Sequence, residues 1–182
     1  MGFTCAELER FRGREVEDLI GPELKLLFVG INPGLWTAAV QTHFAHPANR
    51  FYPALLRAGI IDRTISPAEG MSDEDHAHLR SRGIGITNLV RRASARASEL
   101  SRAELREGGE GLLEVVAEHR PAVVAIAGIT AYRLAFGERR ATLGRQSQAG
   151  DCAARWSGAA LWVVPNPSGL NAHETTSTLA AA

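Results

Sequence analysis

The hydrophobic residues of this chain gather in short runs that predict the strands of a sheet. Three of the runs are continuous and lack polar alternation, at residues 24–31, 121–128 and 160–167. A fourth, shorter segment at residues 83–90 leads into a polar loop. Short apolar runs of this kind are typical of strands that are buried on both faces, as in parallel sheets.

Segments with helical spacing of apolar residues lie between these runs. The spacing predicts a helix over residues 48–58, with Pro53 in its first turn. It predicts a longer helix over residues 101–120, where Ser101 and Glu104 form a capping-box pattern at the start.

Two further segments complete the pattern. Residues 130–136 predict a short helix, and residues 66–83 are polar and acidic, which predicts a loop with a short helix. Because strand and helix signals alternate, we expect an α/β fold with a central, mostly parallel sheet and helices on both faces.

Length and composition are those of one globular domain, which we expect to span residues 1–182. The chain has 182 residues, of which 45% are hydrophobic and 22% charged, so it can bury a sizeable core. No apolar run approaches the roughly 20 residues of a membrane span, and the charged N-terminus is unlike a secretory signal. Cys5 and Cys152 lack CxxC spacing, so neither a disulfide framework nor a zinc site is predicted. We expect a cytoplasmic monomer with no membrane partner.

The chain is neutral overall, with 20 basic and 20 acidic residues, but its charges are unevenly distributed. Arginines gather in residues 80–106 and 120–155, whereas acidic residues gather in 7–23, 73–75 and 107–118. One basic face on a neutral molecule can bind phosphates. The alternative is that these arginines are ordinary solvated surface residues.

Polar amide residues follow the apolar runs in three segments: GINPG at 30–34, TNLVRR at 87–92 and NPSGLNAH at 166–173. Ligands of open parallel sheets bind beyond the carboxyl ends of the strands, so these segments are the expected site. The alternative is that Asn32 and Asn166 bond only the backbone of their own turns. The sequence contains no GxGxxG or GK[ST] motif, so dinucleotide and ATP binding are unsupported.

Four motifs together resemble those of the mismatch-specific uracil-DNA glycosylase and thymine-DNA glycosylase family. They are GINPG, FAHPANRF, GITNLV and NPSGL, in this order within residues 24–173. The first motif lacks the aspartate of the GQDPY motif in the main uracil-DNA glycosylase branch, so that branch is the poorer match. The resemblance implies a uracil-DNA glycosylase-like fold with its core at residues 20–173. It also implies base-excision repair at the bacterial nucleoid, by hydrolysis of the N-glycosidic bond of uracil flipped out of double-stranded DNA, preferentially from G·U mismatches.

The resemblance assigns the first motif and the aromatic loop to the base and the attacking water. Asn32 would hold the water through its side-chain carbonyl oxygen, because an amide can orient water but does not deprotonate it at neutral pH. Phe44 would stack on the flipped base, with a core phenylalanine as the alternative. Backbone groups of Ile31 and Phe44 would bond the uracil edge. Gly34 would allow a close backbone approach, and Thr37 would face the 5-position of the base.

Asn88 supplies a second amide, expected in the same cleft, that would bond uracil or another deaminated base. The alternative is an asparagine that caps the next turn. His43 and His46 are interpreted as structural loop histidines, because no third ligand is spaced for a metal. Asn49 and Arg50 are expected to fix their loop or contact a phosphate.

The NPSGLN segment would supply the wedge that fills the space left by the flipped base. Leu170 is the expected apolar plug, and Ser168 and Gly169 would bond a flanking phosphate and the opposite base. Arg91 and Arg92 would contact phosphates, which positions the DNA without reading its sequence. An asparagine follows the leucine where other members have an arginine, which weakens the expected recognition of the opposite guanine. The expected DNA-contacting segment comprises Asn166, Pro167, Ser168, Gly169, Leu170 and Asn171.

We expect a monofunctional enzyme, because Lys25 is the only lysine and opens the first strand, away from a position where it could form a Schiff base. No metal and no organic cofactor is expected. Broader activity on hypoxanthine or xanthine, or on uracil in single strands, is the alternative within the enzyme class. A catalytically weak module that binds lesions is a second alternative, and an α/β small-molecule binder without salt-dependent DNA affinity is a third.

Overall fold

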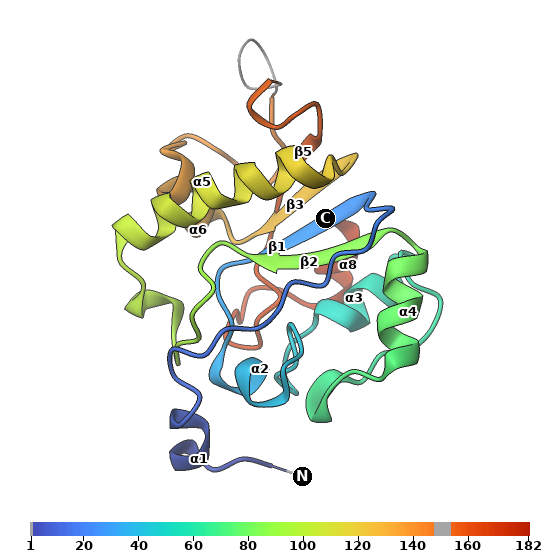
Figure 1. Ribbon diagram of the computed structural model, residues 1–182, viewed down its shortest axis with the longest axis vertical. Helices are drawn as coiled ribbons and strands as arrows, with labels where there is room; N and C mark the ends of the chain where they lie inside the picture. Colours follow the sequence, from blue (N-terminus) through green and yellow to red (C-terminus); the bar gives the residue numbers. More distant parts are fainter. Residues whose placement is uncertain (1, 148–153) are drawn as a thin grey trace.

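Four parallel strands form the centre of the sheet (Figure 1). A short fifth strand pairs antiparallel at one edge. The computed structural model describes residues 2–147 and 154–182. The strand order is β2-β1-β3-β5-β4. Each predicted apolar run contains one parallel strand, which confirms the α/β class. The strands are β1 (Leu26–Gly30), β2 (Ile84–Asn88), β3 (Val123–Ala127), β4 (Gly144–Arg145) and β5 (Ala160–Val164).

The carboxyl ends of the parallel strands meet at one edge of the sheet. Gly30 pairs with Asn88 across β1 and β2, and Ala127 pairs with Val164 across β3 and β5. Because the strands run in the same direction, the segments that follow β1, β2 and β5 leave from this edge. These are the three segments in which the sequence places its polar amides.

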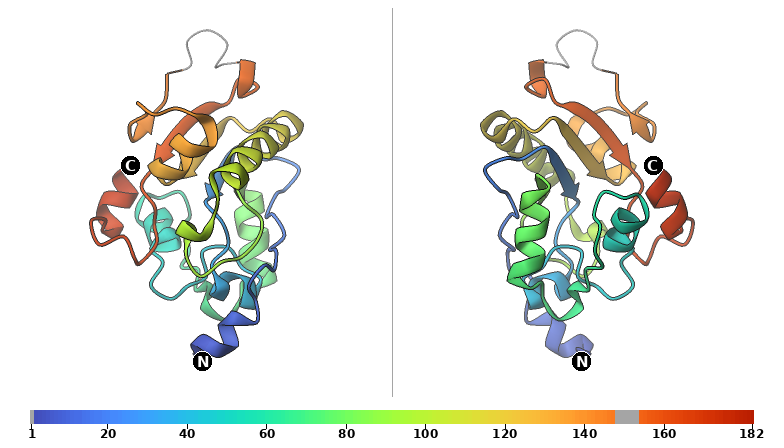
Figure 2. Two further views of the ribbon diagram at one scale, coloured as in Figure 1. Left: turned by 90° about the vertical axis from the view of Figure 1, so that its left-hand side faces the viewer. Right: turned by 90° about the vertical axis from the view of Figure 1, so that its right-hand side faces the viewer.

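Helices cover both faces of the sheet, as the sequence predicts (Figures 1 and 2). The long helix α5 and its neighbour α6 pack on one face, and α3 and α4 pack on the other. The bounds of these helices are α3 (Phe51–Arg57), α4 (Asp73–Ser81), α5 (Arg102–His119) and α6 (Ile129–Phe136).

Side chains of β1 alternate between the two faces, since successive residues of a strand point in opposite directions. Val29 belongs to the core that includes Leu112 of α5, whereas Phe28 belongs to the core that includes Phe51 and Leu55 of α3. Both cores are apolar. Burial on both sides therefore explains why the run from which β1 forms shows no polar alternation.

Helix α5 begins at the predicted capping box and lies against the segment that follows β2. Ser101 Oγ accepts from the backbone N–H of Glu104 at 3.1 Å, and the Glu104 carboxylate accepts from the Ser101 N–H at 2.8 Å. Gly108 makes the close approach, because a Cβ built there would lie 2.0 Å from the Leu89 carbonyl oxygen. Only glycine allows this spacing, so α5 supports the backbone directly after Asn88.

The shortest helices are not apparent from the sequence, because five or six residues show too little of the helical period. One of them, α8, packs against α3 (Figure 2). Cys5 is exposed, and Cys152 lies outside the described residues. In the described ranges no helix is both long and apolar enough to cross a membrane. These short elements are α1 (Cys5–Glu9), α2 (Leu35–Val40), η1 (Pro67–Glu69), η2 (Ala97–Glu99) and α8 (Thr176–Ala181).

Candidate active site

Two loops at the carboxyl ends of β1 and β2 lie side by side, and each of the two segments carries one of the predicted asparagines. Three backbone hydrogen bonds of 2.9, 2.9 and 3.1 Å join residues 89–94 to residues 30–33. Asn32 lies in the first loop, and Asn88 is the last residue of β2. Both side chains are partly buried.

The amide nitrogen of Asn32 is held by three oxygen atoms. Nδ2 donates to the carbonyls of Pro33 and Arg92, both at 3.1 Å, and to Ser94 Oγ at 2.8 Å. Ser94 Oγ donates its own proton to the Arg96 carbonyl at 2.9 Å, so a lone pair of Oγ faces the amide. Because carbonyl oxygens only accept, the atom that faces them must be Nδ2.

The same bonds make Oδ1 the group that Asn32 offers to a ligand. None of the described residues donates a hydrogen bond to it. Gly34, two residues further on, is exposed, and a Cβ built there would meet nothing within 4 Å, so there is open space beside this loop. Asn32 therefore bonds both its own loop and the loop that follows β2 through its nitrogen, and it keeps an acceptor that can orient a water molecule.

Asn88 is held by a histidine rather than by backbone oxygens. His43 Nε2 lies 2.9 Å from the Glu17 carbonyl, which can only accept, so Nε2 carries the proton. His43 Nδ1 then has a lone pair, and Asn88 Nδ2 donates to it at 3.1 Å. Asn88 Oδ1 is the opposite end of this fixed amide.

The environment of His43 favours the neutral imidazole that this bond requires. Burial lowers the pKa of His43, and the hydrogen bond to the Glu17 carbonyl and the charge of Asp18 oppose the shift only in part. The His43 carbonyl accepts from the Tyr52 hydroxyl at 3.0 Å, which fixes the backbone of the same residue. His43 is therefore a rigid, uncharged support for Asn88.

Phe44 adopts a strained backbone conformation next to the two amides. Its φ of +56° lies in the left-handed region, which is uncommon for a bulky residue and frequent at functional sites. One face of its ring stacks on Phe51, with centroids 4.0 Å apart and planes at 24°. A Cβ built on Gly30 would lie 3.3 Å from Phe44 Cζ and 2.4 Å from Asn88 Oδ1. The aromatic edge and the amide oxygen thus share the space above Gly30.

Two other residues of the predicted base pocket lie in the same region without a hydrogen bond to the amides in the described structure. The Ile31 carbonyl accepts from the Val90 N–H at 2.9 Å, and the Ile31 side chain approaches Gly128 at the end of β3. Thr37 is buried in α2, where its carbonyl accepts from the Thr42 N–H at 3.2 Å. Their contacts with a base stay predictions.

Residues 166–171 form a loop that is braced by its own side chains. Asn166 Oδ1 accepts from the Ser168 N–H at 3.0 Å, and Asn171 Nδ2 donates to the Asn166 carbonyl at 3.1 Å. Asn166 thus bonds its own turn, as the alternative interpretation of the sequence holds. Leu170 is 87% exposed at the tip, and Pro167 is buried. The loop therefore presents an apolar side chain that is exposed to solvent in the folded protein.

The two arginines predicted to contact phosphates are both paired with carboxylates. Arg91 bonds Asp18 at 3.1 Å and Glu15 at 3.4 Å. Arg92 bonds Glu104, and this hydrogen bond is the main cause that lowers the pKa of Glu104 to about 2. Their side chains stay 50% and 35% exposed, and their contact with DNA stays a prediction.

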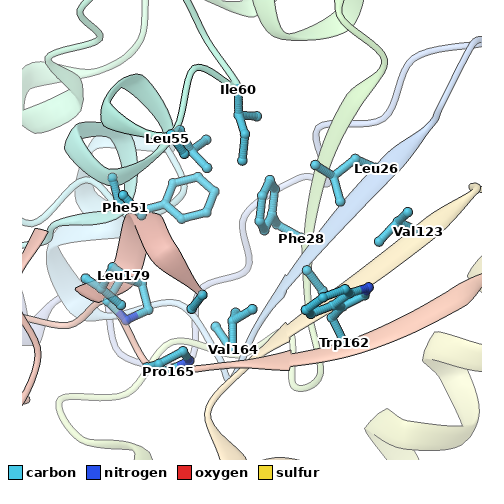
Figure 3. Close-up of a pocket in the computed structure, with 17 residues that line it drawn as sticks. Leu26, Phe28, Phe51, Leu55, Ile60, Val123, Trp162, Val164, Pro165 and Leu179 are labelled. Carbon is cyan, nitrogen blue, oxygen red and sulfur yellow. The ribbon is translucent and has the colours of Figure 1, made fainter. Parts of the chain in front are cut away.

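Two hollows flank this region, and neither is lined by Asn32 or Asn88. An apolar hollow of about 230 Å³ lies between the sheet, α3 and α8, where Phe28, Phe51, Trp162 and Leu179 face one another (Figure 3). A polar hollow of about 340 Å³ is lined in part by His43. Among the described residues, no group of three or more His, Cys, Asp or Glu side chains could hold a metal ion.

Comparison with known proteins identifies the family to which this arrangement belongs. A family model described as the uracil DNA glycosylase superfamily matches residues 17–181, which include both asparagine loops and the loop at 166–171. The chain belongs to the uracil DNA glycosylase superfamily. Membership supports a role as a DNA glycosylase, a hydrolase whose partner is DNA.

A solved structure from another organism has the same fold. The solution NMR structure of a candidate uracil DNA glycosylase from Methanosarcina acetivorans superposes with a TM-score of 0.60 at 19% sequence identity. The match covers 93% of this chain and 95% of that one. At this identity the likeness concerns the fold, and it confirms the expected uracil-DNA glycosylase-like architecture.

Two residues hold the amides of this superfamily member through contacts that the sequence does not indicate. Ser94 is 2% exposed and binds Asn32 across 62 positions of the chain. His43, interpreted from the sequence as a structural loop residue, binds Asn88 across 45 positions. Nothing local marks either residue, because each contact forms only when the β1 and β2 loops come together.

Proposed function

We propose that this chain is a monofunctional DNA glycosylase that hydrolyses the N-glycosidic bond of uracil in DNA, preferentially in G·U mismatches. The observation that carries the proposal is the orientation of Asn32. Its nitrogen donates to three oxygen atoms of the protein, so its carbonyl oxygen is the atom left to accept a hydrogen bond from a ligand. This is the arrangement needed to hold a water molecule without deprotonating it.

In the proposed reaction, water adds to C1′ of the deoxyribose while the bond from C1′ to N1 of uracil breaks. The bonding electrons leave with uracil as an anion, the sugar passes through an oxocarbenium-like state, and the proton lost by the water goes to solvent. Asn32 Oδ1 accepts a hydrogen bond from that water and fixes its approach. No step requires a lysine or a cofactor.

Asn88 and Phe44 would receive the base. The face of Phe44 that does not stack on Phe51 would provide a stacking surface, and stacking contributes about 1–3 kcal/mol per base. Asn88 Oδ1 accepts from an N–H on the base edge, which uracil carries at N3 and cytosine lacks there. The bond from Asn88 to His43 keeps this oxygen directed away from the histidine.

Leu170 would enter the duplex as the base leaves it. Burying an exposed leucine side chain gains roughly 2 kcal/mol, which offsets part of the few kcal/mol needed to unstack a nucleotide. A mismatch lowers that cost further, which favours G·U over A·U. Arg91 and Arg92 would reach phosphates with the exposed part of their side chains.

A second substrate class rests on the same amide. Hypoxanthine and xanthine also present an N–H beside a carbonyl, and Asn88 Oδ1 accepts from such an edge in either ring system. Broader excision of deaminated bases is therefore the alternative function. A catalytically weak lesion binder is the alternative outside the enzyme class.

The test is alkali-developed cleavage of labelled oligonucleotides that carry G·U, A·U, G·T or G·hypoxanthine, alongside single-stranded uracil. Wild type and Asn32→Ala are compared under single-turnover conditions. We expect cleavage fastest at G·U and a loss on the order of a hundredfold or more in the variant. Tight binding to G·U duplex without cleavage by the wild type would instead identify a lesion binder.

A further inference from the structure

One arginine joins the loop that carries the base-stacking residue to the loop that carries the exposed leucine. Arg50 Nη1 donates to the carbonyl of Ser168 at 3.3 Å and to that of Asn171 at 3.2 Å. The backbone N–H of Arg50 donates to the Pro167 carbonyl at 3.0 Å. These three bonds hold the loop at residues 166–171 from its beginning to its end.

A close backbone contact reinforces this attachment. A Cβ built on Gly169 would lie 2.6 Å from the Ala48 Cβ and 2.7 Å from the Ala48 carbonyl oxygen, so glycine is needed for the loops to meet. The two loops lie about 120 positions apart in the chain, at separations of 118 and 121 residues for the Arg50 bonds. Their contact is therefore purely tertiary.

Arg50 is also adjacent to the support of the base-stacking ring. It immediately precedes Phe51, the first residue of α3, and Phe51 stacks on Phe44 at 4.0 Å. A single short segment thus supports Phe44 on one side and the Leu170 loop on the other.

We propose that Arg50 is a positioning residue that couples insertion of Leu170 to capture of the flipped base by Phe44. This inference rests on the proposed function. An unattached loop would lose conformational freedom each time its leucine enters the duplex, and this entropic cost would oppose flipping. Arg50 keeps the loop ordered before DNA binds. Its guanidinium acts on the wedge through two carbonyls of the loop.

The proposal is tested with Arg50→Met, which keeps an unbranched apolar side chain but removes the guanidinium. Cleavage is measured on two duplexes of the same sequence, one with G·U and one with uracil opposite a tetrahydrofuran abasic analogue. The second duplex has no opposite base to separate from uracil, so a wedge matters less there. Arg57→Met is the matched control, because Arg57 is an exposed arginine at the far end of α3, the helix that Arg50 precedes.

We expect Arg50→Met to lose about tenfold or more in kcat/KM on G·U and less than about threefold on the abasic duplex, since charge-assisted hydrogen bonds are among the stronger ones. Arg57→Met should change neither by more than about twofold. Arg50→Lys should recover part of the loss, because one ammonium can reach a carbonyl. The ratio between the two substrates does not depend on the fraction of folded enzyme, so poor folding cannot imitate the result.

Leu170→Ala supplies the second test. If Arg50 acts through the wedge, adding Arg50→Met to Leu170→Ala should lower G·U cleavage by less than about twofold further. Equal losses on both duplexes, or full additivity with Leu170→Ala, would overturn the proposal and identify a general structural or phosphate-binding role. If the wild type cleaves neither duplex, the proposed function has failed. Fluorescence of 2-aminopurine beside a mismatch then tests the coupling alone: a flipping signal that Arg50→Met leaves unchanged would overturn it.

Discussion

Ser94→Ala removes one of the three acceptors that orient the Asn32 amide and leaves every proposed DNA contact in place. Ser94 is buried and lies behind Asn32, so the substitution changes no surface that DNA could touch. The bonds from Asn32 Nδ2 to Pro33 and Arg92, both at 3.1 Å, remain. The perturbation is therefore confined to how firmly the amide is held.

The size of the effect follows from the bond that is lost. A neutral hydrogen bond contributes about 0.5–1.5 kcal/mol net, and about 1.4 kcal/mol corresponds to tenfold in rate. We expect single-turnover cleavage at G·U to slow by roughly two- to tenfold. Substrate affinity should be unchanged. The loss is smaller than for Asn32→Ala, because Oδ1 is still present and only its direction is less constrained.

Ser72→Ala is the matched control, since it removes the N-cap of α4, where Ser72 Oγ accepts from the Asp75 N–H at 3.1 Å. Loss of an N-cap costs about 1 kcal/mol of stability, comparable to the cost expected for Ser94→Ala. Both variants are compared by urea denaturation and by saturating single-turnover kinetics. We expect the two variants to have equal free energies of unfolding, and we expect only Ser94→Ala to react more slowly than wild type. A Ser94→Ala enzyme as fast as wild type would refute the claim that Ser94 orients the amide.

Two further predictions concern stability. Gly108→Ala should lower the free energy of unfolding by about 1–3 kcal/mol, because the new Cβ would overlap the Leu89 carbonyl. Gly111→Ala in the same helix is the control: its Cβ would meet nothing within 4 Å, and the substitution should raise the free energy of unfolding by about 0.5–1 kcal/mol. Equal urea midpoints for these two variants would contradict the close approach. Burial lowers the pKa of His43 in the folded protein, so the unfolded chain takes up a proton near pH 6.5 that the folded chain does not. The free energy of unfolding should therefore fall as the pH drops below about 6.5. His43→Gln should make the free energy of unfolding, measured by urea denaturation at pH 7, 6 and 5, less dependent on pH. An unchanged pH dependence would show that His43 is not its source.

The strands and the larger helices could be predicted because their signals are local. β1 lies within an apolar run that is buried on both faces, and α5 begins at a capping box that is visible in four residues of sequence. The helix predicted over residues 48–58 begins later, at Phe51, because Asn49 Oδ1 accepts from the Phe51 N–H at 2.9 Å and the preceding residues form a turn. The start of such a helix depends on a single side-chain hydrogen bond, which the spacing of apolar residues does not indicate.

The candidate site could be predicted in position but not in orientation. Asparagines at the ends of two neighbouring parallel strands must come close together, and the sequence contains that information. Which atom of each amide faces the ligand depends on Ser94 and His43, which lie 62 and 45 positions away from their partners. The attachment of Leu170's loop to Arg50 depends on contacts that are longer still in sequence. Such contacts exist only in the folded chain.

Both asparagines of this site donate hydrogen bonds from their side-chain nitrogen to acceptors of the protein. A carboxylate has no such donor, so neither asparagine can be replaced by an aspartate without further change. Each asparagine commits Nδ2 to acceptors of the protein: two carbonyls and a hydroxyl for Asn32, and an imidazole lone pair for Asn88. A carboxylate at position 32 would place a negative oxygen against two carbonyl oxygens, and the repulsion would turn it away from the proposed position of the water. A carboxylate at position 88 would face the lone pair of His43 unless the buried imidazole took up a proton, which burial opposes. The framework around these loops therefore favours amides at both positions, which agrees with the proposed reaction, in which water is oriented but not deprotonated by the protein.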